Sequence, residues 1–144
     1  MLRVVLDTNE FVSSVLVHHG LPAQVLDAWR QRQFILIVSP AIIAEIRFTL
    51  NYPRIRRKYP ITDADVQSLV ALLTHDAVVV PGTVTVSGVI PDDPDDERVL
   101  ACAVEGQAEL IVSGDRHLLS VSGFSGITVL RPKEFLEFLS LKSP

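Results

Sequence analysis

The sequence predicts an α/β fold in which a five-stranded parallel sheet lies between two layers of helices. Short runs of apolar, β-branched residues alternate with longer segments of helical periodicity, as in βαβ units. These runs lack the strict apolar–polar alternation of half-exposed strands, so they suit a parallel sheet that is covered on both faces. The 144 residues contain no repeat and no linker, so we expect a single domain over residues 1–144.

The chain is expected to begin with a strand, two helices and a second strand. The apolar residues 2–6 predict the first strand. A helix over residues 10–18 follows and ends at Gly20, a residue type that commonly terminates helices. Pro22 favours the start of the next helix, and the apolar residues 34–38 predict the second strand.

The third helix is expected to begin at Ser39 and Pro40, because a capping hydroxyl followed by proline is a typical helix start. Its apolar residues fall within one arc of about 100°: Ile42, Ile43, Ile46 and Leu50. Glu45 lies about 60° outside this arc, where its side chain can follow the buried edge and present its carboxylate to a cleft. An ordinary flanking acid is the alternative interpretation of Glu45.

The next segment is expected to hold one helix and the third strand. Residues 51–59 are basic, and we expect them to be irregular because prolines interrupt them. Thr62 and Asp65 resemble a capping box and predict a helix that starts there and continues to about Leu73. The third strand is predicted at residues 77–80.

A loop rich in proline, glycine and aspartate is expected over residues 81–94, with a short extended piece at residues 84–86. It leads into a helix that begins near Asp93 and Pro94, and Asp96 continues the apolar stripe of this helix toward the core. The neighbouring acids are expected to point elsewhere: Asp92, Asp95 and Glu97. The helix dipole, which favours acids in a first turn, is the alternative explanation of the cluster.

The last part of the chain repeats the arrangement seen at the first strand. A fourth strand over residues 109–113 ends in a hydroxyl and a carboxylate, Ser113 and Asp115. A short helix over residues 116–120 and a fifth strand over 127–130 follow. The closing helix, residues 132–141, is expected to turn its apolar residues inward: Phe135, Phe138 and Leu139.

Four carboxylates have independent reasons to point toward one place: Asp7, Glu45, Asp96 and Asp115. The first and fourth strands are commonly neighbours in a doubly wound sheet, which would bring Asp7 and Asp115 to the crevice where such sheets bind ligands. Capping of the following helix is the alternative role for Asp7. Two unit charges about 4 Å apart repel by roughly 4 kcal/mol at an effective dielectric of about 20, so protons or cations must accompany such a group. Oxygen ligands select Mg²⁺ or Mn²⁺, and carboxylate-held ions of this kind support phosphodiester or phosphoryl chemistry.

Composition limits the other functional classes. The net charge of −4, from 13 Lys and Arg against 17 Asp and Glu, is unlike a general nucleic-acid coat. The bases nevertheless cluster at positions that suit a phosphate backbone, with a solvated basic loop as the alternative: Arg54, Arg56, Arg57 and Lys58. The apolar runs are too short to cross a membrane, and nothing at the N-terminus resembles a secretion signal. A single cysteine, Cys102, fits a reducing cytoplasm.

The order of these motifs resembles the PIN domain family, in particular its branch of toxins from prokaryotic toxin–antitoxin systems. The resemblance covers nearly the whole chain and rests on the residues around Asp7, Glu45, Asp96 and Asp115. It implies a ribonuclease that cleaves single-stranded RNA with Mg²⁺ or Mn²⁺, is frequently a homodimer, and is often held inactive by a cognate antitoxin protein. It also implies that these four acids are the catalytic metal ligands. Three polar residues would support them: Thr8, Asn9 and Ser113.

The sequence departs from the family at two positions. Glu10 stands where the family usually has an apolar residue and adds charge beside the expected site. His117 stands where some relatives carry a further acid, so a fifth carboxylate ligand is missing there.

Two other functions remain open from the sequence. A catalytically silent binding module would keep the fold and the acids without turnover. A phospho-acceptor receiver domain is also a doubly wound sheet with an acidic metal pocket, and residues 131–133 faintly resemble its lysine–proline signature. The third expected strand, however, ends at Val80 and Pro81, where a receiver requires an aspartate.

Overall fold

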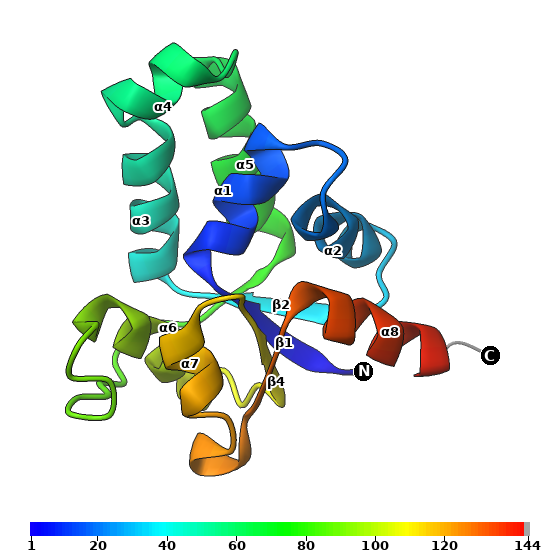
Figure 1. Cartoon of the computed structure of the whole chain (residues 1–144), viewed down its shortest axis with the longest axis vertical. Helices are drawn as coiled ribbons and strands as arrows, with labels where there is room; N and C mark the ends of the chain where they lie inside the picture. The colour runs from blue at the N-terminus through cyan, green and yellow to red at the C-terminus, as the bar shows by residue number, and fades with distance from the viewer. Residues whose placement is uncertain (143–144) are drawn as a thin grey trace.

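Five parallel strands form one sheet in the order β3–β2–β1–β4–β5, and helices cover both of its faces (Figure 1). The structure is a computed structural model that describes residues 1–142; residues 143 and 144, the end of the expected domain, lie outside the described residues. The strands are β1 (Arg3–Leu6), β2 (Ile35–Val38), β3 (Val78–Val79), β4 (Leu110–Val112) and β5 (Thr128–Leu130). The predicted fold class, a three-layer α/β/α arrangement with a five-stranded parallel sheet, is confirmed.

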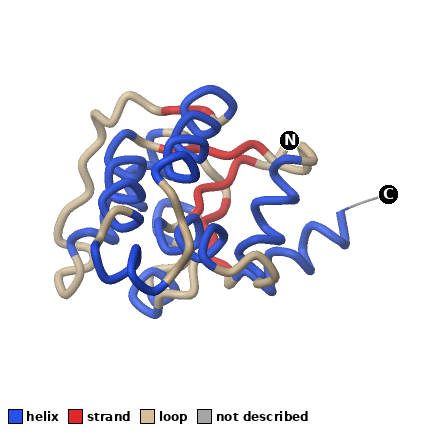
Figure 2. Tube along the Cα trace, turned by 90° about the horizontal axis from the view of Figure 1, so that it is seen from above, coloured by secondary structure: helices blue, strands red, loops and turns tan. Residues whose placement is uncertain are grey.

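The helices are divided unequally between the two faces of the sheet, as Figure 1 shows, and Figure 2 gives the view of the same molecule from above. One face is covered by α1 (Thr8–Leu16), α2 (Leu21–Arg30), α3 (Pro40–Leu50), α5 (Asp63–Asp76) and α8 (Pro132–Lys142). The other face is covered by α6 (Pro94–Glu105) and α7 (Arg116–Ser120), followed by the short 3-10 turn η1 (Phe124–Gly126). The remaining helix, α4 (Pro53–Lys58), lies at the end of α3 that is remote from the sheet.

The strand order fixes where a ligand site can form. From β1 the chain moves outward to β2 and β3, and it then returns past β1 to β4 and β5. The crevice at the carboxyl ends of β1 and β4 is therefore the switch point, the usual ligand site of open α/β sheets. A receiver domain has the order 2-1-3-4-5 instead. The observed order excludes the receiver alternative.

The core lies on both sides of the central strands. Val4, Val5 and Leu6 of β1 are fully buried, as the lack of alternation in this run predicted. On α3, Ile42 and Ile46 are also fully buried, so the expected apolar arc of this helix packs inward. The segment that carries Asp7 at its end is thus anchored on both faces of the sheet.

Two predicted helix starts have the expected capping hydrogen bonds. The Ser39 hydroxyl accepts the amide of Ile42 at 3.2 Å. Thr62 and Asp65 form a reciprocal capping box, because each side chain accepts the backbone amide of the other residue.

Several expected boundaries and elements are wrong. The first helix begins at Thr8 and ends at Leu16, and Gly20 is the N-cap of α2 and does not end α1. The third strand contains only two paired residues, whereas four were expected, and residues 84–86 lie in the loop that was expected there. The short third strand is consistent with its place at the edge of the sheet, where β3 pairs on one side with β2.

Residues 51–59, expected to be irregular, contain the helix α4. Pro53 occupies the first turn of α4, where its fixed φ favours a helix and its missing amide hydrogen costs nothing. Arg56 then ties α4 to its neighbours, donating hydrogen bonds to the Leu50 carbonyl, the Asn51 side chain and the Asp63 carboxylate. The prediction treated proline as a breaker and missed its role as a helix starter.

Candidate active site

Asp7 and Ser113 lie side by side at the carboxyl ends of β1 and β4. The register pairs Leu6 with Val112, and the Asp7 amide donates to the Val112 carbonyl at 3.0 Å. The buried Ser113 hydroxyl donates to the Asp7 carboxylate at 2.7 Å and accepts the Asp115 amide at 2.9 Å. One hydroxyl therefore fixes the Asp7 carboxylate relative to the backbone of the segment that carries Asp115.

The capping role considered for Asp7 does not explain its side chain. Asp7 occupies the N-cap position of α1, but its carboxylate makes no capping hydrogen bond. Burial raises the pKa of Asp7, and the nearby charge of Asp115 raises it further. The Ser113 hydroxyl, followed by the amides of Thr8 and Asn9, offsets part of this rise in the pKa.

The closest group of carboxylates is Asp93, Asp96 and Asp115. One oxygen from each lies within 4.8 Å of the others. Asp115 caps α7 by accepting the His117 amide at 2.7 Å, which holds its carboxylate in place. Asp93 was expected only as a helix cap, yet its side chain makes no capping hydrogen bond. Sequence reasoning missed Asp93 as a site residue because an aspartate before proline is so often a cap.

Asp96 is the buried member of this group. It is 8% exposed, in the first turn of α6, as the apolar stripe predicted. Burial raises its pKa to about 8, with further contributions from Asp115, Asp7 and Asp93. One oxygen, Oδ2, is buried without a hydrogen-bond partner. An orphaned carboxylate oxygen beside two further carboxylates is the donor set that a hard divalent cation requires.

Glu45 reaches toward the same centre from α3. It is half-buried and accepts a hydrogen bond from the Thr8 hydroxyl at 3.2 Å. Burial raises the pKa of Glu45, and the charges of Asp95 and Asp7 raise it further. Glu45 thus lies within electrostatic reach of Asp7, although its oxygens are outside the closest group of carboxylates. Thr8 orients Glu45, while Asn9 is exposed to solvent.

Glu10, noted in the sequence as an unusual charge, lies buried beside Asp7. Burial, together with the charge of Asp7, raises the pKa of Glu10 to about 7, and its Oε2 has no hydrogen-bond partner. The buried acids of the site therefore include one that the family pattern does not predict. The backbone amide of His117 donates a hydrogen bond to the Asp115 carboxylate, and this is how His117 supports the site.

Glu97 was expected to point away from the apolar stripe that Asp96 continues, and its side chain is turned to the loop before α6, which buries it. Its side chain is buried, and its Oε2 accepts the amides of Val89 and Ile90 at 2.7 and 3.0 Å. These amides belong to the loop that ends at Asp93, so Glu97 attaches this loop to α6. The spacing between a loop and a later glutamate carries no periodic signal, which is why the sequence did not reveal the contact.

Comparison with known proteins identifies the family. The sequence model of the PIN domain matches residues 3–117. This chain belongs to the PIN domain family. A relative described as uncharacterized protein MJ1680, from Methanocaldococcus jannaschii, is 28% identical to the chain over 144 residues, covering 94% of the chain and 90% of that protein.

Solved structures share the fold of this PIN domain at low sequence identity. VapBC2 from Rickettsia felis, solved with a DNA fragment from its promoter, matches with a TM-score of 0.60 and 10% identity, covering 90% of the chain and 98% of that chain. FitAcB from Neisseria gonorrhoeae matches with a TM-score of 0.54 and 14% identity, with the same coverage. FitAB bound to a DNA fragment matches with a TM-score of 0.55 and 18% identity, covering 90% of the chain and 94% of that chain. The PIN domain family is generally composed of nucleases that use divalent metal ions, and the acidic group described above fits that chemistry.

Proposed function

We propose that residues 1–144 act as a single PIN domain that cleaves phosphodiester bonds of single-stranded RNA with Mg²⁺ or Mn²⁺. The observation that carries this proposal is the group of Asp93, Asp96 and Asp115 with the unpartnered Oδ2 of Asp96. Since the family is generally nucleolytic, phosphodiester hydrolysis is the chemistry that best fits this group.

In this proposal Asp7, Glu45, Asp96 and Asp115 hold the metal, as the sequence resemblance implied, and Asp93 joins them. The ion would supply charge neutralisation at the phosphoryl group and an activated water. Ser113 holds the Asp7 carboxylate, and Thr8 holds that of Glu45. Asn9, exposed at the start of α1, is proposed as a further polar support.

We also propose a biological setting for the enzyme. The solved neighbours VapBC2 and FitAB are two-component assemblies described with DNA fragments, which supports a toxin with a cognate antitoxin partner. A homodimer and a cytoplasmic location are part of the same proposal. Among residues 1–142, no helix is both long and apolar enough to cross a membrane.

The test is cleavage of an end-labelled, unstructured RNA by the purified protein. We expect cutting with Mg²⁺ or Mn²⁺, none in excess EDTA, and loss of cutting in Asp7→Asn and Asp96→Asn. Asp92→Asn is the matched control, because Asp92 is an exposed acid of the same segment. If Asp96→Asn cuts as fast as the parent, the site is misassigned. Calorimetric titration that detects no Mn²⁺ binding at millimolar concentration would leave only the silent binding module.

A further inference from the structure

Two aromatic side chains on α3 and just beyond it are exposed without a partner in the core. Phe48 is 70% exposed and Tyr52 is 50% exposed, with ring centroids 6.3 Å apart and ring planes tilted by 47°. The core-facing arc of α3 is already filled by residues such as Ile46, so Phe48 is not needed for packing. We call Phe48 and Tyr52 the aromatic strip.

The aromatic strip starts beside the candidate active site. Glu45 and Phe48 are three residues apart in α3, so their side chains lie on one side of the helix. Tyr52 lies beyond the end of α3, and the 6.3 Å between the two ring centroids places it next to Phe48. At 1.5 Å of rise per residue, Phe48 lies about 5 Å along the helix from Glu45, and Tyr52 continues the strip beyond it. Arg47 and Asn51, by contrast, lie on the opposite flank of α3 and line a cavity against α5.

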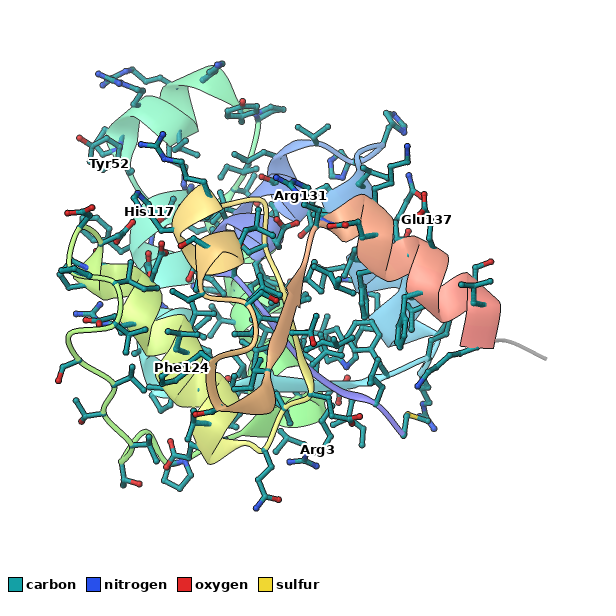
Figure 3. The ribbon with its side chains drawn as sticks, turned by 60° about the horizontal axis from the view of Figure 1, so that its bottom comes forward. Arg3, Tyr52, His117, Phe124, Arg131 and Glu137 are labelled. Carbon is teal, nitrogen blue, oxygen red and sulfur yellow. The ribbon has the colours of Figure 1, made fainter. Side chains whose placement is uncertain are left out.

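At its far end the aromatic strip meets a basic helix. Tyr52 is the N-cap of α4, and side chains with nitrogen at their tips project outward from α4 near Tyr52 (Figure 3). Arg54, Arg57 and Lys58 are exposed and form no ion pair within residues 1–142. Arg56 is different, because its hydrogen bonds and its ion pair with Asp63 hold α4 against α3 and α5.

We propose that the aromatic strip stacks unpaired bases of a single-stranded RNA whose phosphates lie along Arg54, Arg57 and Lys58. Every base has a π-face, so stacking on aromatic side chains accepts any sequence, while adjacent cations neutralise the backbone. A duplex keeps its bases stacked internally and cannot use the strip, which makes the site selective for single strands. The identity of the nucleic acid rests on the proposed function. The strip would deliver the strand toward the acids beside Glu45.

A second copy of the chain is the competing occupant of this surface. A two-fold interface sets one patch against its own copy. Two such surfaces would bring the cations of one α4 toward those of the other, and like charges across an interface cost binding free energy. The charge of the surface therefore favours a polyanion.

The first experiment measures binding in EDTA, so that no RNA is cut. Fluorescence anisotropy reports the affinity of the full chain for a labelled, mixed-sequence RNA of 12 nucleotides without internal pairing, and for the same strand in a duplex. We expect Phe48→Ala and Tyr52→Ala to weaken binding of the single strand at least about fivefold each. Leu141→Ala, which removes an exposed apolar side chain on α8, should leave the affinity unchanged. Replacing Arg57 and Lys58 by glutamine should make the slope of log K for RNA binding against log salt concentration less steep, by about 0.7 for each phosphate contact that is lost.

Two substitutions at Phe48 separate stacking from simple apolar contact. Phe48→Leu keeps an apolar side chain without a π-face, so it should bind RNA as poorly as Phe48→Ala. Phe48→Trp should retain the affinity and lose fluorescence when bases stack on the new indole. The native Trp29 is buried in the core and gives a constant background. Leu141→Trp is the matched control for quenching.

The outcomes decide between the proposals. Strip-dependent binding without cleavage in Mg²⁺ or Mn²⁺ would support the strip and refute the proposed function. Cleavage with an unchanged KM in the Phe48→Ala, Tyr52→Ala double variant would support the function and refute the strip. Equal affinity of Phe48→Leu and the parent would refute stacking. If light scattering shows a dimer that Phe48→Ala converts to a monomer, while RNA binding is unchanged, the surface is an interface between copies and the proposal is overturned.

Discussion

Replacing Asp96 by asparagine should stabilise the metal-free protein, because this carboxylate is buried among like charges. The pKa of Asp96 is raised from 3.8 to about 8. At pH 7.5 this difference corresponds to an upper limit of about 5 kcal/mol of destabilisation. Solvent at the mouth of the site and relaxation of the neighbouring acids reduce it, and we expect about 1–3 kcal/mol.

The direction of the pH dependence follows from the direction of the shift. The folded protein binds the Asp96 proton more tightly than the unfolded chain does, so the resulting stabilisation is complete below about pH 4 and is lost as the pH rises to about 8. Asp7, whose pKa is also raised, acts in the same sense. The free energy of unfolding of the parent should therefore fall between pH 5 and pH 8, and Asp96→Asn should show less of this fall.

Thermal and urea unfolding in EDTA at pH 5.0 and pH 7.5 test the prediction. At about 3 °C per kcal/mol for a chain of this size, Asp96→Asn should raise Tm by about 3–9 °C at pH 7.5, and by less at pH 5.0. Asp92→Asn, at an exposed position, should change Tm little. Saturating Mn²⁺ should reverse the order, because it binds the folded parent more tightly than the variant. A variant that is less stable than the parent at pH 7.5 in EDTA would show that Asp96 is not under repulsion in the metal-free fold.

Two further predictions concern residues around α6. Glu97→Gln should destabilise the protein by about 1–3 kcal/mol in urea unfolding, because it replaces the carboxylate that accepts the amides of Val89 and Ile90. It should also weaken Mn²⁺ binding, measured by calorimetry, because it releases the loop that carries Asp93. Unchanged affinity for Mn²⁺ would show that Asp93 is positioned without the loop. Gly106→Ala should lower the free energy of unfolding in urea by about 1–3 kcal/mol, because the new methyl group would overlap the Ile37 side chain and crowd the Cys102 carbonyl at 3.2 Å. An unchanged free energy of unfolding would mean that α6 shifts freely against β2.

The parts of the fold that sequence patterns predicted are those in which one local rule acts alone. The apolar run before Asp7 and the capping box of Thr62 and Asp65 both appear as expected. Asp96 was placed correctly because its position continues an apolar stripe with helical spacing. The contacts that the sequence did not reveal join segments that are separated along the chain. Glu97 is buried only because the preceding loop folds back onto it.

The candidate site shows the same division. The neighbouring positions of Asp7 and Asp115 follow from strand order, and strand order follows from general rules for doubly wound sheets. Asp93 was overlooked because its local sequence favours a cap, and only the assembled crevice turns its carboxylate toward Asp96 and Asp115. The aromatic strip was also missed, since exposure of Phe48 on a mostly apolar helix depends on which neighbours cover it.

The loop between β3 and α6 is fastened at both ends by a single helix. Glu105 accepts the amides of Gly82 and Thr83 and the Thr83 hydroxyl, while Glu97 holds the other end at Val89 and Ile90. Between these fastenings lies Gly88, which has a φ of 75° that favours glycine and has no atoms beyond those of its chain neighbours within 4 Å of its Cβ position. Because closing a longer loop costs only about 0.6 kcal/mol for each doubling of its length, this tip can accept an inserted epitope or reporter peptide. A label inserted there would precede Asp93 and Asp96 by only a few residues in the sequence, and it would leave the hydrogen bonds of Glu97 and Glu105 intact.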